Sequence, residues 1–168
     1  NIILFFTKRG VILIILQQLL NLPIILFNLD NLDIWPLFRG GILYALGVAL
    51  IFSSLFINMK PFIQIYIGAG VLFINYFIAS IFLTNSSNNT ILNLFFVPGD
   101  NNLVSINYPA LPWIGITILG LGIGKINLHS TENLRPYYLR TGIILLLIFV
   151  ILRFVNYGDY NHKNLVGF

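Results

Sequence analysis

Long runs of apolar residues constrain this chain more than any other feature of its sequence. Hydrophobic residues make up 58% of the 168 residues and charged residues only 8%, whereas a soluble domain uses about 25% charged residues to cover its surface. A hydrocarbon core about 30 Å thick requires roughly 20 apolar residues per helix. The sequence therefore excludes a soluble globular enzyme and predicts an all-α, polytopic transmembrane bundle of about five helices.

The apolar runs place these helices within a single transmembrane domain over residues 1–168. We expect them at residues 10–27, 41–57, 61–83, 109–128 and 138–157. The runs end at residues that are costly in hydrocarbon, such as Asp30 after the first helix and Lys60 between the second and third. The chain opens at Asn1, and no signal-peptide pattern precedes its first apolar run. We therefore expect a fragment of a longer protein, with further N-terminal helices upstream.

Charged residues assign a side of the membrane to each loop, because cytoplasmic loops carry an excess of Lys and Arg. The N-terminal segment and the second and fourth loops hold Lys8, Arg9, Lys60, Lys125, Arg135 and Arg140. The first and third loops and the C-terminal tail hold Arg39, Lys163 and most of the acidic residues, namely Asp30, Asp33, Asp100 and Asp159. We therefore expect a cytoplasmic N-terminus and a C-terminus outside.

Two stretches of small residues predict where helices approach one another closely. Gly41, Ala45 and Ala49 recur at four-residue spacing, and Gly120 with Gly124 forms a GxxxG pattern. Small residues let two helix backbones come together in a membrane. We interpret both stretches as packing faces rather than as ligand contacts.

The third loop, residues 84–108, is the longest connection in the chain. Loops of this length are often functional or disordered. Its apolar run Leu94–Val97 predicts an interfacial or re-entrant segment on the outer face.

The chain offers few residues for catalysis. It has no Cys and two His, His129 and His162, so we expect neither a thiolate nor a His-rich metal site. Its Lys and Arg are scattered and form no basic run for nucleic acid. No His, Asp or Glu falls within the expected helices, although acid–base catalysis needs a titratable group held in a pocket. His129 is expected in a solvated loop, so this segment alone cannot assemble a catalytic centre.

Polar residues inside the expected helices are informative because each costs several kcal/mol unless it is satisfied. Arg153 precedes Asn156 by three residues and Tyr157 by four, so the three share one face of the last helix. Arg153 is either a buried cation, paired with Asp159 or Asp100, that holds a polar group near the outer end, or an Arg whose charge reaches the interface.

A second polar stripe lies on the first helix, where Gln17, Gln18 and Asn21 occur within five residues. We interpret it as facing the bundle and forming hydrogen bonds between helices.

Two motifs resemble a known family. The first motif resembles the "YPLLPWIG…LG…G" signature of bacterial membrane proteins related to the heparan-alpha-glucosaminide N-acetyltransferase catalytic domain. It consists of Tyr108-Pro109-Ala110-Leu111-Pro112-Trp113-Ile114-Gly115, which runs on into Leu119-Gly120-Leu121-Gly122-Ile123-Gly124. The segment Leu152-Arg153-Phe154-Val155-Asn156-Tyr157-Gly158-Asp159 is similar to that family's "LR…N.YGD" motif. Weaker similarities occur at Lys8–Gly10 and Gly41–Gly47, so the resemblance covers essentially the whole chain.

The resemblance implies an acyltransferase of the bacterial cytoplasmic membrane. Such a protein moves an acetyl group from cytoplasmic acetyl-CoA, its co-substrate, to a saccharide acceptor, an amino sugar, on the outer face. The family's catalytic histidine is expected in a helix upstream of this chain, so no catalytic residue is carried over and enzyme activity of the chain itself stays open. No metal is implied. The expected partners are the lipid bilayer, the upstream helices and the saccharide.

The same motifs predict an acceptor side built from two outer helix ends. The polar lining consists of Arg153, Asn156, Tyr157 and Asp159. The entry turn consists of Tyr108, Pro109, Pro112 and Trp113, since two prolines restrict the backbone and an indole ring anchors at the interface.

Two other classes of function remain open from the sequence. One is a transporter or flippase subunit for a lipid-linked or saccharide substrate, which is typically marked by discontinuous helices and charge at mid-depth. The other is a structural membrane subunit without catalytic activity, which the scarcity of ionisable groups within the helices also fits.

Overall fold

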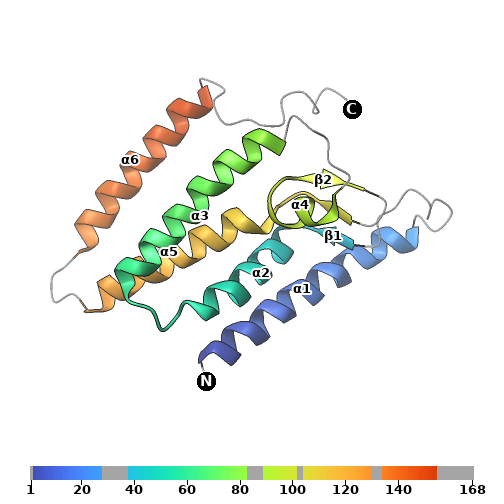
Figure 1. The fold of residues 1–168 in the computed structure, drawn as a ribbon, viewed down its shortest axis with the longest axis horizontal. Helices are drawn as coiled ribbons and strands as arrows, with labels where there is room; N and C mark the ends of the chain where they lie inside the picture. Colours follow the sequence, from blue (N-terminus) through green and yellow to red (C-terminus); the bar gives the residue numbers. More distant parts are fainter. Residues whose placement is uncertain (1, 28–37, 83–88, 102–103, 130–133, 155–168) are drawn as a thin grey trace. The chain divides into compact units, whose positions relative to one another are not determined.

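The computed structural model describes residues 2–27, 38–82, 89–101, 104–129 and 134–154, which form six helices and three short strands (Figure 1). In chain order these are α1 (Ile2–Phe27), β1 (Phe38–Gly40), α2 (Ile42–Leu55), α3 (Pro61–Phe82), α4 (Thr90–Phe95), β2 (Gly99–Asp100), β3 (Val104–Ile106), α5 (Ala110–His129) and α6 (Arg135–Phe154). Of these helices, α1, α3, α5 and α6 are long and apolar enough to cross a membrane. The expected all-α bundle of membrane type is confirmed.

Several helix boundaries differ from the expectation. Helix α1 begins at Ile2 rather than at residue 10, and α6 begins at Arg135 rather than at residue 138. Lys and Arg are good helix formers, so Lys8 and Arg9 lie on a continuous helix and do not end it. His129 is the last residue of α5 and not a loop residue.

Helix α2 is shorter than the expected span. It has 14 residues, and its chain turns after Leu55, where the N–H of Phe56 donates to the carbonyl of Ser53. Pro61 then opens α3, at a helix position where a missing N–H costs nothing. Seven α2 residues are buried, namely Tyr44, Ala45, Gly47, Val48, Ala49, Ser53 and Ser54. Helix α2 is therefore the central element of the core and not a full-length membrane span.

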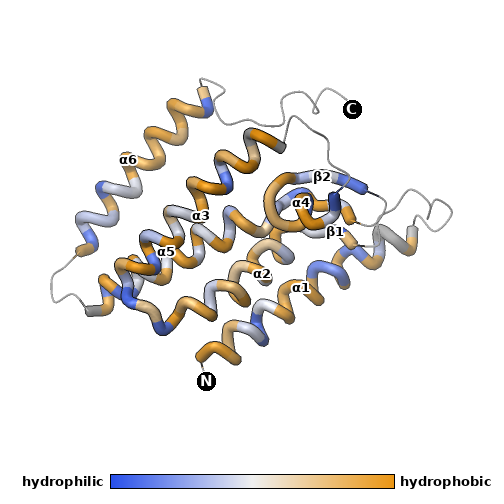
Figure 2. The backbone as a smooth tube through the Cα atoms, in the orientation of Figure 1, coloured by the Kyte–Doolittle hydropathy of each residue, from blue (hydrophilic) through white to orange (hydrophobic). Residues whose placement is uncertain are grey.

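The chain divides into two compact units, Asn1–Lys125 and Ile126–Phe168. The first contains the helices from α1 to most of α5 together with the strands. The second contains α6, along which no residue is buried. Most residues of the helices are hydrophobic, whereas parts of α1 and of the strand region are hydrophilic (Figure 2).

Glycines set the helix contacts within the first unit. A Cβ atom at Gly10 would lie 2.5 Å from the carbonyl oxygen of Gly47, so α1 and α2 touch backbone to backbone. A Cβ at Gly68 would lie 2.7 Å from the carbonyl oxygen of Gly115, which places α3 equally close to α5. At Gly120 and Gly124, no described atom lies within 4 Å of such a Cβ. Within the described part of the first unit, the GxxxG pair of α5 therefore makes no helix contact, and its role stays a prediction.

The rotation of α5 about its axis determines which of its glycines face α3. Gly115 and Gly122 are seven residues apart and lie on one face, and a Cβ at Gly122 would lie 2.7 Å from the carbonyl oxygen of Pro61. The pair Gly120 and Gly124 lies on a different face. On α2 the expected small-residue face is confirmed, since Ala45 and Ala49 are completely buried.

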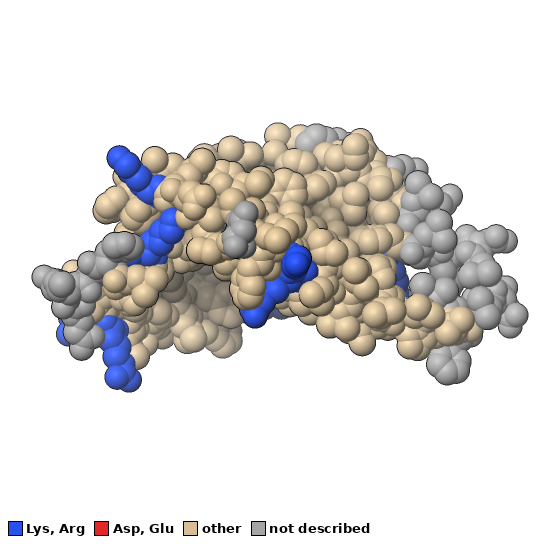
Figure 3. Space-filling view, turned by 90° about the horizontal axis from the view of Figure 1, so that it is seen from below, with Lys and Arg blue, Asp and Glu red and all other residues tan. Residues whose placement is uncertain are grey.

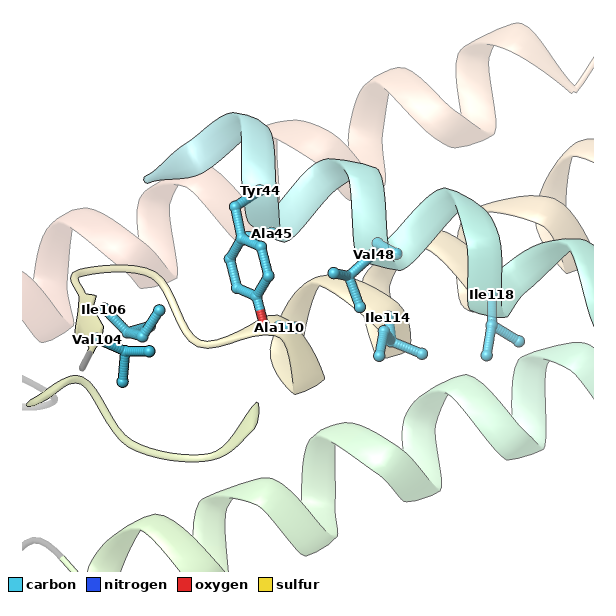
Figure 4. Close-up of a cluster of buried hydrophobic side chains, with 9 residues drawn as sticks. Tyr44, Ala45, Val48, Val104, Ile106, Ala110, Ile114 and Ile118 are labelled. Atoms are coloured by element: carbon cyan, nitrogen blue, oxygen red, sulfur yellow. The ribbon is translucent and has the colours of Figure 1, made fainter. Parts of the chain in front are cut away.

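The core joins α2 to α5 and to strand β3. Its buried apolar residues are Tyr44, Ala45, Val48, Ala49, Val104, Ile106, Ala110, Ile114 and Ile118 (Figure 4). Val104 and Ile106 are two residues apart on a strand, so their side chains share the face that packs toward the helices. The loop before α5 therefore contributes directly to the core.

A three-stranded sheet, absent from our sequence expectations, closes one end of the first unit. Its strand order is β1-β3-β2, with β1 parallel and β2 antiparallel to the central β3. The strands contain two or three residues each, too few to produce a recognisable alternation in the sequence. Because β1 follows the first loop and β2 and β3 belong to the third, these two loops lie at the same end of the bundle.

Basic side chains lie at the connection between α2 and α3, which is at the other end of α2 from the sheet. Lys60 is exposed in their connection. Figure 3 shows the molecule from below the view of Figure 1, with Lys and Arg in blue. The side of the membrane that this end faces stays a prediction from the positive-inside pattern.

Candidate functional site

Three amide side chains of α1 bind strand β1 and the first turn of α2. Asn21 Nδ2 and Gln18 Nε2 both donate to the backbone carbonyl of Arg39, at 3.0 and 3.2 Å. Gln17 Oε1 accepts from the N–H of Leu43 at 3.3 Å, in the first turn of α2. The expected inward-facing stripe on α1 is confirmed. Its main partner, however, is a strand carbonyl rather than another helix.

In the described part of the third loop, asparagine side chains bind nearby backbone and side-chain groups. Asn89 caps α4 by accepting from the N–H of Ile91 at 3.0 Å. Asn101 accepts from the N–H of Val104 at 2.8 Å and donates to Thr90 Oγ1 at 3.0 Å. Asparagine side chains thus satisfy backbone groups that a loop leaves open.

The apolar run at residues 94–97 packs inward. Leu94 and Phe95 lie against the core cluster, and Val97 is buried. Tyr44 of α2 donates its hydroxyl to the carbonyl of Leu94 at 3.2 Å, which links this run to the centre of the bundle. The run was expected as an interfacial or re-entrant segment, and the structure shows it as part of the packed loop.

The sheet has one apolar and one polar face. Phe38, Gly40, Val104 and Ile106 occupy the face toward the helix core, where a Cβ at Gly40 would lie 2.4 Å from Ile106 Cδ1. The register pairs Arg39 with Ser105 and Ser105 with Asp100. Residues in register on adjacent strands project to the same side of a sheet.

We call Arg39, Ser105 and Asp100 the polar row. It runs across all three strands on the face opposite the core. Ser105 at its centre is 8% exposed, Arg39 is partly buried, and Asp100 is exposed. Adjacent strands lie about 4.8 Å apart, so the Cα atoms of Arg39 and Asp100 are separated by about 10 Å. The row places a cation, a hydroxyl and a carboxylate side by side.

The expected entry turn lies where the sheet joins α5. The rings of Tyr108 and Trp113 meet edge to face with 6.4 Å between centroids. Pro109 precedes the first residue of the helix and Pro112 lies in its first turn, where an N–H has no partner within the helix. Tyr108 is 44% exposed and Trp113 is partly buried against the core. Tyr108 and Trp113 are therefore in ring contact at the start of α5.

The expected polar lining is described only at Arg153. This residue lies in the last turn of α6, next to an open depression lined by Phe149, Val150, Arg153 and Phe154. Its partners in the prediction, Asn156, Tyr157 and Asp159, lie outside the described residues. Arg153 belongs to the second unit and the entry turn to the first, so their juxtaposition stays a prediction.

A third polar cluster, which the sequence analysis missed, closes the connection between α2 and α3. Lys125 Nζ donates to the carbonyls of Ile57 and of Met59, the latter at 2.9 Å. Gln64 Nε2 donates to the carbonyl of Phe56 at 2.7 Å, and the Gln64 side chain is completely buried. These bonds satisfy carbonyls at the end of α2. From the sequence, Lys125 was interpreted only as a residue that marks the cytoplasmic side of the membrane.

In the described part of the chain, no group of three or more His, Cys, Asp or Glu side chains is placed so that it could hold a metal ion. Of the acidic residues, Asp100 alone belongs to the described segments. Within the described segments, strand register thus aligns this acidic residue with Ser105 and Arg39.

Comparison with known protein families gives a match over most of the chain. A family model described as "Heparan-alpha-glucosaminide N-acetyltransferase, catalytic" matches residues 5–154. No curated protein and no solved structure matches the chain. The matched range runs from the first turns of α1 to the end of α6 and includes the strands, the entry turn and Arg153.

Proposed function

The chain belongs to the heparan-alpha-glucosaminide N-acetyltransferase catalytic family, and on this premise we propose that it forms part of a membrane acyltransferase. The proposed reaction moves an acetyl group from cytoplasmic acetyl-CoA to an amino sugar or other saccharide on the outer face of a bacterial cytoplasmic membrane. The observation that carries the proposal is the family match over residues 5–154. Four helices that are long and apolar enough to cross a membrane support it.

In this proposal the chain supplies the scaffold and the acceptor side of the enzyme. The entry turn, formed by Tyr108, Pro109, Pro112 and Trp113, admits the acceptor, while Arg153 and Asp159 line its path. Acetyl-CoA acts as a co-substrate that arrives from the opposite side. The catalytic group that takes up or transfers the acetyl unit is assigned to no residue of the chain.

Acetyl transfer in membranes tests this proposal. The complete protein is expressed and inserted, and transfer of labelled acetyl from acetyl-CoA to glucosamine is measured. We expect Arg153→Ala and Asp159→Ala to abolish transfer, because each removes a charged group from the acceptor path. Membrane insertion of the variants is verified by their yield in the membrane fraction. Arg140→Ala is the matched control, since it removes an exposed Arg near the other end of the same helix.

The outcomes separate the functions left open above. No transfer by the unsubstituted protein removes the enzyme proposal and favours transport or a structural role. Transfer that survives both substitutions keeps the enzyme but removes the reason for assigning Arg153 and Asp159. Loss of transfer in Arg140→Ala as well points to a general effect of charge on α6.

The proposed orientation has its own test, for which the chain is well suited because it contains no Cys. Single cysteines at two exposed positions, Lys60→Cys and Asn107→Cys, are treated with a membrane-impermeant maleimide from outside. We expect Asn107→Cys to react and Lys60→Cys to stay unmodified. The reverse pattern inverts the topology and places the acceptor side at the connection between α2 and α3.

A further inference from the structure

Helices α1, α2, α3 and α5 and the connection between α2 and α3 contain no Asp or Glu. Their charged residues are Lys8, Arg9, Lys60 and Lys125. Like charges that lie close together repel one another, and an anion placed among them offsets this repulsion. If these cations gather at one end of the unit, the anion that balances them must come from outside these elements.

Lys60 and Lys125 meet at the connection between α2 and α3. Lys60 is exposed and directly follows Met59, whose carbonyl oxygen accepts from Lys125 Nζ at 2.9 Å. Lys125 Nζ also donates to the carbonyl of Ile57. Both acceptors are neutral, so they satisfy hydrogen bonds of the ammonium group without cancelling its charge. Two positive charges therefore belong to this connection.

Lys8 and Arg9 of α1 lie at the same end of α2. A Cβ atom at Gly10 would lie 2.6 Å from Ile51 Cγ1, and the N-terminus of α1 lies at the end of α2 that leads into α3 (Figure 1). Ile51 is four residues before Leu55, the last residue of α2. At 1.5 Å per residue, Lys8 and Arg9 therefore lie within about 6 Å of the end of α2 along the helix axis. We call Lys8, Arg9, Lys60 and Lys125 the basic end.

The backbone at this connection does not oppose an anion. Carbonyl oxygens at the C-terminal end of a helix carry partial negative charge, but those of Phe56, Ile57 and Met59 already accept from the side chains of Gln64 and Lys125. The next helix, α3, presents its N-terminus here, where the helix dipole favours negative charge. The backbone therefore adds to the attraction between the four cations and an anion.

Exposed apolar side chains lie next to the charges of the basic end. Those that flank Lys60 in the sequence are Leu55, Met59 and Phe62, which are 64%, 41% and 64% exposed. On α1, the guanidinium of Arg9 lies over the ring of Phe5, 4.1 Å from its centroid, and this ring is also exposed. A soluble anion would leave the apolar surface in contact with water, whereas a molecule with an anionic head and hydrocarbon chains covers it. The basic end therefore fits an anionic amphiphile.

We propose that the basic end binds the phosphate of an anionic phospholipid, whose acyl chains cover the exposed apolar residues beside it. Ammonium and guanidinium groups form charge-assisted hydrogen bonds with phosphate oxygens, and basic sites between membrane helices bind anionic headgroups. The positive-inside pattern requires only a general excess of cations in a loop, whereas this proposal adds a site that selects one class of lipid. It goes beyond the proposed function and does not depend on acetyl transfer.

Lipid selectivity at the connection tests the proposal in the complete protein, carrying a single cysteine and reconstituted in nanodiscs. A bimane fluorophore on Asn58→Cys, an exposed position in the connection, is quenched by brominated phosphatidylglycerol or by brominated phosphatidylcholine with the same acyl chains. Asn107→Cys, an exposed asparagine at the other end of α2, is the matched control. One Lys or Arg near an anionic lipid changes binding by about fivefold. We expect phosphatidylglycerol to be preferred at least threefold at residue 58 and not at residue 107, and equal quenching at residue 58 overturns the proposal.

Removal of charge shows which side chains hold the phosphate. We expect Lys60→Gln, and the double variant Lys8→Gln with Arg9→Gln, each to lower the preference at residue 58 at least twofold. Arg140→Gln, which removes an exposed cation of α6, is expected to leave it unchanged. Helix content measured by circular dichroism verifies that the variants are folded. A preference that survives both changes, or that falls equally in Arg140→Gln, reflects general surface charge and overturns the site.

Soluble phosphates separate a lipid site from a nucleotide site. Inorganic phosphate or coenzyme A is added to the nanodiscs in excess over the brominated lipid. We expect the preference for phosphatidylglycerol to persist with both. Displacement by coenzyme A alone assigns the basic end to a nucleotide phosphate, and displacement by both compounds assigns it to any phosphate anion. Either result overturns the lipid site.

Discussion

Gly68 is the position at which the packing of α3 against α5 is most open to a quantitative test. A Cβ atom there would lie 2.6 Å from the backbone nitrogen of Leu119 and 2.7 Å from the carbonyl oxygen of Gly115. Both atoms belong to the backbone of α5 and cannot rotate away. Gly68→Ala therefore forces the two helices apart. Gly70 is the matched control, because it lies in the same helix and a methyl group added there would have no described atom within 4 Å.

The difference between the two variants isolates the clash. Replacing Gly by Ala within a helix gains up to about 1 kcal/mol from helix propensity, and this gain is common to both positions. Overpacking a close contact costs about 1–3 kcal/mol. We therefore expect Gly68→Ala to be about 1–3 kcal/mol less stable than Gly70→Ala.

Reversible unfolding in mixed micelles, titrated with a denaturing detergent, measures this difference. Near-native helix content of both variants before titration is the control for insertion and folding. Equal stability of Gly68→Ala and Gly70→Ala within about 0.3 kcal/mol would refute the inferred backbone contact between α3 and α5, since a contact of 2.6 Å cannot be relieved without cost.

Two further predictions concern side chains that bind backbone carbonyls. Lys125→Met is expected to lower the free energy of unfolding by about 1.5–3 kcal/mol, because it removes charge-assisted hydrogen bonds to the carbonyls of Ile57 and Met59; an unchanged unfolding curve in the same micelles would contradict this. Asn21→Leu is expected to lower the free energy of unfolding by about 0.6–1.7 kcal/mol, because it removes the hydrogen bond to the Arg39 carbonyl. Amide hydrogen exchange that becomes faster only in β1 would show that the variant opens this strand locally and does not destabilise the whole fold.

The sequence predicted the membrane class and the long helices because their signal is local. An apolar run such as residues 110–128 identifies a span whatever the rest of the chain does. The same local logic located the inward amides Gln17, Gln18 and Asn21, because polar groups in an apolar helix must find partners. It did not identify the carbonyl of Arg39 as their main partner, since β1 is separated from them by a loop.

The GxxxG pattern did not identify the glycines that contact α3, for a related reason. Gly120 and Gly124 satisfy the pattern, but the contact with α3 uses Gly115 and Gly122. A spacing rule defines a face of a helix without specifying which face meets a neighbour. That choice depends on the rotation of α5, which is fixed by the burial of Ala110, Ile114 and Ile118 against α2 and the sheet.

For the candidate site, the sequence identified the entry turn and Arg153 through motifs, and the structure describes them in separate units. The polar row was not identified. Arg39 and Asp100 were treated as outer loop charges, and Ser105 carried no signal at all. Residues 39, 100 and 105 become neighbours only through strand pairing between two loops.

The sequence by itself determined that this protein is an apolar helical bundle of membrane type and a member of its family, because hydropathy and motifs add up residue by residue along the chain. Only the tertiary structure decided that α2 has 14 residues, that a three-stranded sheet lies before its first residue, and that strand register aligns a cation, a hydroxyl and a carboxylate on neighbouring strands. These features arise from contacts between distant segments, whose free energy depends on helix rotation and strand register and is not a sum over neighbouring residues.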